Sequence, residues 1–418
     1  MRHAAIADDF TGATDLAGNW RARGLRTSVL LGAEHDPADL AGLEDDDAVV
    51  VALKTRSIAA DDAVEQGLTA ARLLRGLGYE QLYDKYCSTF DSTPAGNIGP
   101  VADALLELTG ASRAVVVPSF PDNHRTVYQG HLFVGSQPLD ESPLKDHPLN
   151  PMRDSDVARI LSPQTVHQVG LVPHDVVRQG PAAVREALDR AEGDGRRLVV
   201  VDAVSNEDLA VIAEATRQDP LVTGGSGLAL GAPTGVGQPE EVTDTGSEKL
   251  ILSGSASAAT QEQVQRAQAY LAHRRLDAAA LAGDRDAELD RVVTWVREEW
   301  RRAPGSPVLV YSVGHTDDLD PDPAVRSATA PLVEAALADV AALLSGDGAL
   351  QLVVAGGETS GAVLERLGVR RLRVGQPLSP GVSWLSGTDA TGTDHNVVLK
   401  SGNFGTPDLF LTAWEALR

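Results

Sequence analysis

Two adjacent carboxylates, Asp8 and Asp9, directly follow a short apolar segment at residues 4–7. The segment is typical of a buried strand, and the Thr-Gly pair at 11–12 leads into a helix. Two acids at the end of a buried strand are costly unless they are paired, protonated or bound to a metal. One of them could instead be the general base for a substrate hydroxyl. The simpler interpretation is that Asp8 or Asp9 only caps the helix, since Asp is a favoured N-cap residue.

Basic residues stand in or beside other loops that follow expected strands. They are Lys54, Arg56, Lys85 and Arg125. The chain as a whole carries a net charge of −23, so these cations near Asp8, Asp9 and Asp91 run against the general composition. A guanidinium fork matches a carboxylate, and the pattern indicates a small, anionic, hydroxylated ligand. The alternative for each cation is a solvated surface charge or a salt bridge to a neighbouring Asp.

A glycine-rich segment at 356–361 follows an expected strand and opens a helix, which is the arrangement of a phosphate-binding loop. Glycines let backbone N–H groups approach an anion closely, and the helix dipole favours negative charge there. Similar loops follow strands at 253–255 and 401–405. Neither the P-loop pattern nor the dinucleotide fingerprint occurs in the chain. The alternative is a set of tight turns that only pack.

Strand, polar loop and helix alternate through most of the chain, which predicts an α/β fold with mainly parallel sheets covered by helices. Expected strands include 4–7, 27–31, 48–53, 81–86, 113–117, 198–201, 250–252, 308–313, 351–355 and 397–400, and a helix is expected over 258–274. Residues 118–160 break the alternation, as ligand-binding loops often do. The longest stretch without periodicity, 235–248, predicts a boundary between domains 1–235 and 236–418.

Length and composition narrow the class of protein. A chain of 418 residues is too long for one ordinary core, so two domains are expected. The net charge of −23 argues against nucleic acid or an anionic membrane surface as a partner. The single cysteine, Cys87, excludes an intrachain disulfide and favours a cytoplasmic location. Without a run of about 18 apolar residues, no membrane span is expected.

Several segments, taken together and in order, resemble the four-carbon acid sugar kinases. They are IADDFTGATDLAG at 6–18, KYCSTFDSTPAGNIGP at 85–100, TGGSGLA at 223–229, SGSASAAT at 253–260, AGGETSGAVLERLGV at 355–369 and LKSGNFG at 399–405. The segment KYCSTFDST at 85–93, together with residues 118–135 and HPLNPM at 147–152, is similar to the 3-oxo-tetronate kinase branch of this family. The resemblance implies an N-terminal domain that binds the acid sugar, a C-terminal domain that binds ATP, and an active site in the cleft between the two domains.

The resemblance also implies a reaction and a set of site residues. The reaction is phosphoryl transfer from ATP to the 4-hydroxyl of 3-oxo-tetronate, either 3-dehydro-L-erythronate or 3-dehydro-D-erythronate, with Mg²⁺ as the metal. Asp9 or Asp8 is expected to be the catalytic base, with Asp8 as a candidate Mg²⁺ ligand. Residues expected to bind substrate are Thr11, Arg56, Lys85, Ser88, Asp91 and Arg125. Residues expected to bind ATP are Ser255, Ser257, Gly356, Gly357, Glu358, Thr359, Ser360, Gly402 and Asn403.

Other functions remain open at this stage. Within the kinases, D-threonate or D-erythronate could be the acceptor, because stereochemistry depends on side-chain placement of about 1 Å. A non-catalytic sensor of a sugar acid and a nucleotide is an alternative of a different class. A haloacid dehalogenase-type phosphatase is disfavoured, because Asp8 and Asp9 are adjacent rather than separated by one residue. The oligomeric state is also open, with a homo-oligomer as one option.

Overall fold

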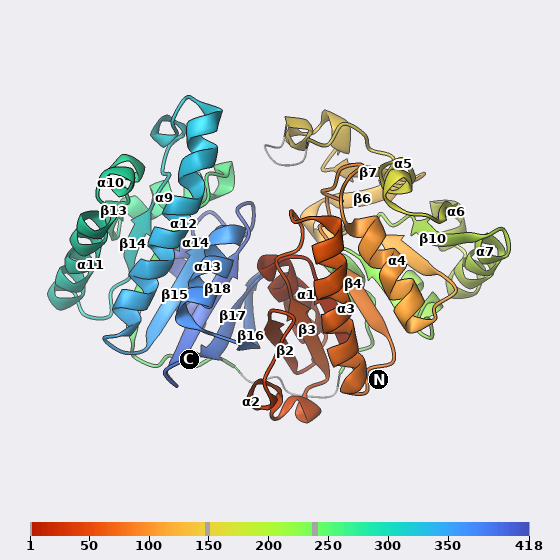
Figure 1. The fold of residues 1–418 in the computed structure, drawn as a ribbon, viewed down its shortest axis with the longest axis horizontal. Coiled ribbons are helices and arrows are strands. Elements are labelled where there is room, and N and C mark those ends of the chain that lie inside the picture. Colours follow the sequence, from red (N-terminus) through yellow and green to blue (C-terminus); the bar gives the residue numbers. More distant parts are fainter. Residues whose placement is uncertain (1, 147–150, 236–240, 418) are drawn as a thin grey trace. The chain divides into compact units, whose positions relative to one another are not determined.

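The computed structural model describes residues 2–146, 151–235 and 241–417, and the chain divides into two compact units, Met1–Gln238 and Pro239–Arg418. The boundary expected between residues 235 and 236 falls at residues 236–240, which lie outside the described part of the chain, as do residues 147–150 of the HPLNPM segment. Each unit is an α/β layer structure built on its own run of strands (Figure 1).

The first unit is organised by a parallel sheet in the order β2-β3-β1-β4-β11-β5-β10-β9. Its strands are β1 (His3–Ala7), β2 (Thr27–Leu31), β3 (Ala48–Ala52), β4 (Leu82–Lys85), β5 (Ala114–Val117), β9 (Gln168–Val172), β10 (Arg196–Val201) and β11 (Leu221–Gly224). Strands β2 and β3 are buried at every position, as expected for strands covered on both faces. A separate antiparallel sheet contains β6 (Arg125–Tyr128), β7 (His131–Val134) and β8 (Gln137–Pro138).

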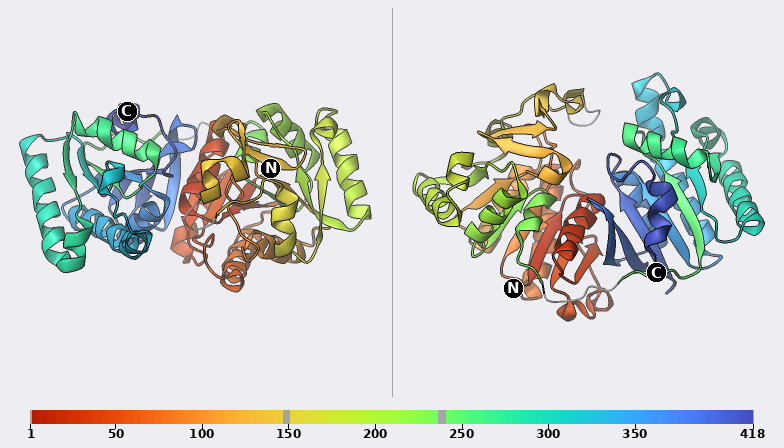
Figure 2. Two further views of the ribbon diagram at one scale, coloured as in Figure 1. Left: turned by 90° about the horizontal axis from the view of Figure 1, so that it is seen from above. Right: turned by 180° about the vertical axis from the view of Figure 1, so that it is seen from behind.

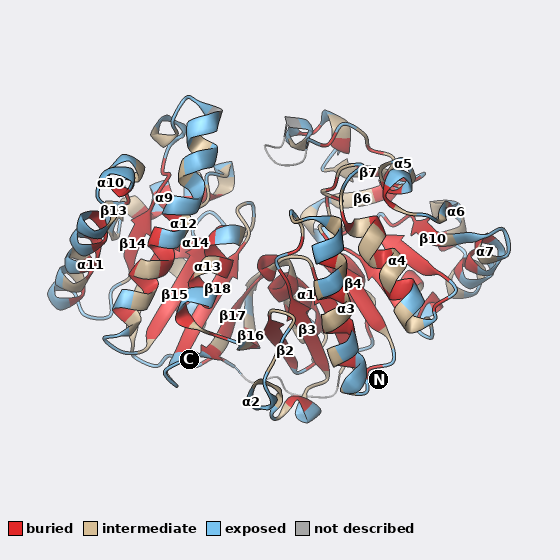
Figure 3. Ribbon diagram, in the orientation of Figure 1, coloured by how far each residue is buried: buried red, intermediate tan, exposed pale blue. Residues whose placement is uncertain are grey.

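Helices cover both faces of the first sheet. They are α1 (Phe10–Ala22), α2 (Pro37–Leu40), α3 (Ala60–Gly76), α4 (Ile98–Thr109), α5 (Val157–Leu161), α6 (His174–Val177), α7 (Pro181–Gly193) and α8 (Asn206–Ala215). One core joins the strands to α3 and α4 through side chains such as Ile6, Val51, Leu74 and Leu105. Helices α1, α7 and α8 lie on the opposite face, as the rear view in Figure 2 shows. Burial follows the same layers, with strands buried and the outer faces of the helices exposed (Figure 3).

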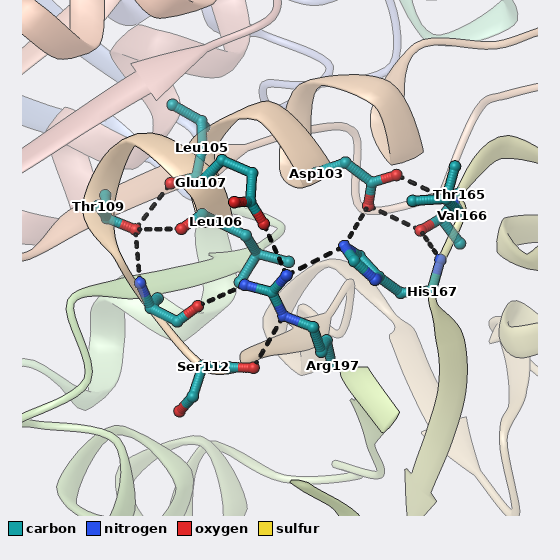
Figure 4. A network of polar contacts seen from close by, with 11 residues as sticks. Asp103, Leu105, Leu106, Glu107, Thr109, Ser112, Thr165, Val166, His167 and Arg197 are labelled. Carbon is teal, nitrogen blue, oxygen red and sulfur yellow. Dashed lines mark hydrogen bonds and ion pairs between the residues drawn. The ribbon is translucent and has the colours of Figure 1, made fainter. Parts of the chain in front are cut away.

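A polar network ties strand β10 and the segment before the edge strand β9 to α4 (Figure 4). Arg197 donates to the carbonyls of Ala111 and Ser112 at 2.8 and 3.0 Å and to the Glu107 carboxylate at 2.6 Å. Asp103 accepts from the Thr165 hydroxyl at 2.7 Å. These bonds satisfy carbonyl groups beyond the end of α4, where the helix can no longer do so.

The second unit has the strand order β13-β14-β12-β15-β18-β17-β16. Its strands are β12 (Glu248–Ser253), β13 (Ala272–Arg275), β14 (Val308–Tyr311), β15 (Leu350–Ala355), β16 (Arg371–Ser379), β17 (Val382–Thr388) and β18 (Asp394–Lys400), and its helices are α9 (Ala258–Gln268), α10 (Ala278–Gly283), α11 (Arg285–Arg302), α12 (Pro323–Ser345), α13 (Gly357–Leu367) and α14 (Leu409–Thr412). The first five strands in this order, β13, β14, β12, β15 and β18, pair in parallel. Strand β17 pairs antiparallel with both β18 and β16. The fold class expected from the sequence is therefore confirmed.

One local expectation was wrong, and one pair of strands was not anticipated. The helix expected over 258–274 ends at Gln268, and residues 272–275 form the edge strand β13. The antiparallel pair β16 and β17 was not expected, although Trp384, Leu385 and Val374 are buried there. In both places tertiary pairing decides the structure over a local pattern that is weak for strands.

Helix α12 is apolar and long enough to cross a membrane by length and composition alone over residues 324–345. It nevertheless carries Asp339, which forms an ion pair with Arg366 at 2.6 Å. Its buried side chains include Leu337, Val340 and Leu344, and the helix packs against α11 and α13. These contacts are those of a core helix in a folded domain.

Gly99, in the first turn of α4, provides a test of close packing. A Cβ atom at this position would overlap the carbonyl group of Gln164, with the Gln164 Cβ only 2.6 Å away. Gly99→Ala is therefore expected to lower the free energy of unfolding by about 1–3 kcal/mol. The matched control is Gly76→Ala at the end of α3, where nothing lies within 4 Å and a small stabilisation is expected. Urea denaturation of both variants measures this, and equal stabilities would contradict the packing described.

Candidate functional site

In the first unit, the order of the strands places a topological switch point between β1 and β4. From β1 the chain runs to β2 and β3 on one side and then to β4 on the other side. In open α/β sheets, ligands bind beyond the carboxyl ends of strands at such a point. Backbone bonds knit these ends together, because the Asp8 N–H donates to Lys85 at 3.0 Å and the Thr55 N–H donates to Asp8 at 3.0 Å. The sequence expectation that these loops meet is correct.

Arg56 binds both adjacent acids. Its guanidinium donates to the two oxygens of Asp8, each at 2.7 Å, and its Nη2 lies 3.0 Å from Asp9 Oδ1. Asp9 is also the N-cap of α1, because its Oδ1 accepts from the Gly12 N–H at 2.8 Å. The capping interpretation therefore holds for Asp9, whereas Asp8 is held by a bidentate ion pair, which is a strong and directional contact.

The acids and Lys85 share one electrostatic environment. Burial raises the pKa of Asp9, but Arg56, Lys85, the Gly12 N–H and the Thr11 hydroxyl outweigh it and hold that pKa below its ordinary value. Lys85 is 2% exposed, and a Cβ atom on Gly12 would clash with both its ammonium and the Asp9 carboxylate. Glycine at position 12 thus allows α1 to approach the charged pair. Asp9 is consequently ionised at neutral pH.

Buried polar atoms without a partner gather around the same strand ends. Among the described residues they include one oxygen each of Asp15, Asp84 and Asp91, the Ser119 hydroxyl, the Asn123 amide nitrogen and Arg125 Nε. Buried polar groups are nearly always hydrogen-bonded in folded proteins, so such a cluster calls for a bound molecule or water. Both donors and acceptors are present, as a ligand with hydroxyl and carboxylate groups would require.

Asp15 is one of four members of this cluster that the sequence analysis did not identify, the others being Asp84, Ser119 and Asn123. It lies one turn after Thr11 on α1 and is 5% exposed. Burial raises its pKa to about 6, although a hydrogen bond with Ser226 and the charges of Lys85 and Arg125 oppose the shift. The spacing of four from Thr11, which places both side chains on one face of a helix, is the signal that could have identified it.

Asp84 and Asp91 line a small cavity together with Asp8, Arg56 and Asn97. The cavity has a volume of about 30 Å³, which holds one or two waters but no sugar acid. Burial and the charge of Asp8 raise the pKa of Asp84 to about 8, so this carboxyl is protonated at neutral pH. Asp91, expected to bind substrate, therefore lies in the wall of a water-sized cavity.

The remaining cations differ in their surroundings. Burial lowers the pKa of Arg125 below its ordinary value, while nearby Cys87 and Asp15 oppose that shift. Its Nη1 donates to the Asn123 carbonyl, and its Nε is free of protein partners among the described residues. Lys54 is exposed. Ser88 lies against Gly225, where a Cβ atom would stand 3.1 Å from the Ser88 Cβ.

In the second unit, a switch point lies between β12 and β15, and three loops converge there. Ser257 caps α9 and donates to the Gly402 carbonyl, and its hydroxyl lies 3.2 Å from that of Ser255. A Cβ atom on Gly402 would lie 2.6 Å from Ser255 Oγ. Gly356, with φ of +123°, brings the start of α13 beside Gly254 and Ser255. The three loops predicted from the sequence therefore form one cluster.

Individual side chains of this cluster face different ways. The Ser360 hydroxyl is buried and donates to the Gly356 carbonyl at 2.7 Å. Its proton is therefore not available to an anion at the loop, and only the position of Ser360 in the first turn of α13 remains relevant there. Thr359 is 2% exposed and lies against Gly254 and Gly356. Glu358 and Asn403 are exposed, and Gly357 is half-buried. The first N–H groups of α13 have no acceptor within their own helix, which makes this end suited to an anion.

Comparison with known proteins identifies both units. A family model described as a sugar-binding N-terminal domain matches residues 3–232, and one described as a nucleotide-binding C-terminal domain matches residues 250–410. The fold is thus that of a two-domain kinase of small sugar acids. The chain belongs to the four-carbon acid sugar kinase family and is similar in sequence to members of its 3-oxo-tetronate kinase branch, as the motifs indicated.

Named relatives support this assignment over nearly the whole chain. The 3-oxo-tetronate kinases of Burkholderia multivorans, Pseudomonas fluorescens and Salmonella typhimurium are 43%, 42% and 39% identical and cover 99%, 98% and 99% of this chain and 96%, 95% and 98% of their own. A solved structure from Salmonella typhimurium LT2 matches with a TM-score of 0.88 at 36% identity over the whole of both chains. The Haemophilus influenzae protein HI1011 matches with 0.77 at 36% identity over 99% of both chains.

Asp15→Asn tests the buried carboxylate of the first unit. A carboxyl whose pKa rises from 3.8 to about 6 on folding destabilises the protein wherever it is ionised. The variant is therefore expected to be more stable than the wild type above pH 6, by up to about 3 kcal/mol, with the difference vanishing below pH 4. Denaturation midpoints at pH 4, 6 and 8 measure this. A stability gain that does not depend on pH would contradict the buried-acid explanation.

Proposed function

We propose that the protein is an ATP-dependent kinase that phosphorylates the 4-hydroxyl group of 3-oxo-tetronate. The observation that supports this most strongly is the 39–43% identity, over nearly the whole chain, to proteins named 3-oxo-tetronate kinase. The first domain, 1–235, would bind the sugar acid, and the second, 236–418, would bind ATP. The scheme requires the phosphoryl group bound by the second domain to reach the hydroxyl bound by the first. A cytoplasmic location, where ATP is available, fits this activity.

Lys85 and Arg125 are proposed to bind the substrate carboxylate. Lys85 is buried and Arg125 is half-buried, both act on the pKa of Asp15, and Arg125 Nε has no protein partner among the described residues. Arg56 is already committed to Asp8 and Asp9, so its proposed part is to hold the two acids in place. Asp15 would accept a hydrogen bond from a substrate hydroxyl through its unpartnered oxygen. Thr11 and Ser88 complete the proposed wall of this site, whereas Asp91 lines the neighbouring water-sized cavity.

Asp9 is the stronger candidate for the residue that orients the attacking hydroxyl. Phosphoryl transfer depends mainly on positioning and charge neutralisation, so a carboxylate with a lowered pKa is adequate. Both oxygens of Asp8 are bound by Arg56, which makes Asp8 the less available of the two. Mg²⁺ in kinases is usually held by substrate phosphates with one or two carboxylates, and Asp8 and Asp9 are the acids proposed for it. No cluster of three metal-ligating side chains occurs in the part of the chain described here.

The ATP phosphates are proposed to bind at the three converging loops of the second domain. Ser255, Ser257 and Thr359 line them, and Gly356, Gly357 and Gly402 keep the backbone open to an anion. Glu358, Ser360 and Asn403 belong to the same loops, as the first turn of α13 and the turn after Gly402. The N–H groups and helix dipole of α13 would neutralise part of the phosphate charge.

Asp9→Asn tests the proposed chemistry without removing the helix cap, because Asn caps helices as well as Asp. The variant is expected to lose about 100-fold or more in kcat while still binding ADP. Asp156→Asn, at the N-cap of α5, is the matched control and should keep full turnover. Release of ADP is followed in a coupled assay with ATP, Mg²⁺ and 3-oxo-tetronate. Unchanged turnover of Asp9→Asn would remove Asp9 from the reaction.

A panel of four-carbon acids distinguishes the remaining alternatives. 3-Oxo-tetronate of either configuration is expected to give a higher kcat/KM than D-threonate or D-erythronate. The planar carbonyl at C3 only accepts hydrogen bonds, whereas the tetrahedral hydroxyl in the other two acids also brings a donor that would stay unpaired in a site fitted to the carbonyl. A preference for D-threonate or D-erythronate would identify one of the related kinases instead. Binding of acid and nucleotide without any ADP release would indicate a sensor.

A further inference from the structure

A buried lysine lies beneath the converging loops of the second domain. Lys400 ends β18, and its side chain is 0% exposed. Its ammonium donates to Thr260 Oγ1 and Gln263 Oε1, each at 2.7 Å, and to the Gly402 carbonyl at 3.2 Å. None of these partners carries a negative charge. A buried ammonium with only neutral partners costs folding free energy, so stability alone does not account for this side chain.

The Lys400 contacts control the orientation of one peptide group. The Gly402 carbonyl accepts from the hydroxyl groups of Ser257 and Thr260 as well as from Lys400, so it is held toward the interior. A trans peptide is planar, with its C=O and N–H pointing in opposite directions. The N–H of Asn403 is therefore directed outward. No acceptor for this N–H is found in the part of the chain that the structure describes.

The same network fixes the loop as a whole on helix α9. Gln263, which accepts from Lys400, donates through its Nε2 to the carbonyls of Phe404 and Thr406 at 3.1 and 2.9 Å. The loop after β18 and the first turns of α9 are thus joined through Lys400. Ser255 and Ser257, which line the cluster, lie immediately before α9.

We propose that Lys400 is a positioning residue for the nucleotide phosphates: it turns the 402–403 peptide so that its N–H faces the bound anion, and it places a positive charge beneath that anion. This inference deepens the proposed function and rests on ATP binding at these loops. Because the ammonium is already held by three protein oxygens, it acts through the loop rather than by touching the phosphate.

The charge of Lys400 suits the proposed positioning role. Burial lowers its pKa to about 7, and a phosphate group nearby would favour the protonated form. On the helices around it, the other ionisable groups are Glu262, Arg266, Glu358, Glu365, Arg366 and Asp408. Glu262 and Arg266 pair with each other on α9. Lys400 is therefore the cation beneath the loops, and nucleotide binding is expected to weaken as the pH rises from 6 to 9.

Lys400→Met in the full chain tests the proposal, with ADP as the probe in calorimetric titrations. The variant is expected to bind ADP at least about 10-fold more weakly. This is the loss typical of one hydrogen bond to a charged group, here the bond from the Asn403 N–H to the phosphate. It should also lose the decline of ADP affinity with rising pH. The matched control is Lys249→Met at the start of β12, whose lysine pairs with Asp244 at 3.7 Å and should keep the wild-type affinity.

Thr260→Val keeps the test decisive if the Lys400 variant fails to fold. It removes one donor to the Gly402 carbonyl and one partner of Lys400, so weaker ADP binding with an unchanged KM for the sugar acid is expected. Wild-type ADP affinity in a folded Lys400→Met, or in Thr260→Val, would overturn the proposal. A wild-type protein that binds no ADP would instead contradict the proposed function itself.

Discussion

The ion pairs of Arg56 with two neighbouring carboxylates are the constraint on which the first domain depends. Asp8 and Asp9 follow a buried strand, where two negative charges side by side would repel each other and lose their hydration. One guanidinium contacts three of their four oxygens and so offsets the cost of placing both carboxyl groups at the edge of the core. Lys85, placed by the neighbouring strand β4, adds the second cation. The cost of burying the two carboxyl groups is thus offset by cations from both neighbouring strands, Arg56 after β3 and Lys85 at the end of β4.

The two proposed sites would bind anions in different ways. The first would use side-chain cations that are buried or half-buried, beside several polar atoms that have no protein partner among the described residues. The second uses backbone N–H groups, glycines and a helix end, with its lysine set back beneath the loops. Side-chain cations suit a small ligand whose shape must be recognised, whereas backbone groups suit phosphates, which are common to many nucleotides. This division agrees with the family descriptions of a sugar-binding and a nucleotide-binding domain.

The sequence predicted the strand ends well, because apolar runs followed by polar loops are a strong signal in parallel sheets. It thereby located Asp8, Asp9, Arg56 and Lys85, and the three glycine-bearing loops. It could not assign direction to a side chain: Ser360 proved to bond its own helix. The roles of Asp15 and Lys400 depend on burial, which a single sequence does not display. The expectation of an active site shared by the two domains stays a prediction.

The strands β13, β16 and β17 were missed for a different reason. Strand β13 has only four residues, and β16 has irregularities in its pairing with β17. Strand formation there depends on neighbours distant in sequence, which local periodicity does not report.

The unpartnered oxygen of Asp15, with the similar groups on Ser119, Asn123 and Arg125, has a consequence for selectivity. These groups are already out of water before any ligand arrives, so their dehydration is part of the cost of folding. A ligand with complementary groups recovers that cost, whereas one lacking a single hydroxyl leaves a buried dipole stranded. Such a site would select its ligand mainly by the free energy lost when an incomplete ligand leaves a buried polar atom unpaired. The selectivity would come at the cost of some folding free energy in the empty protein.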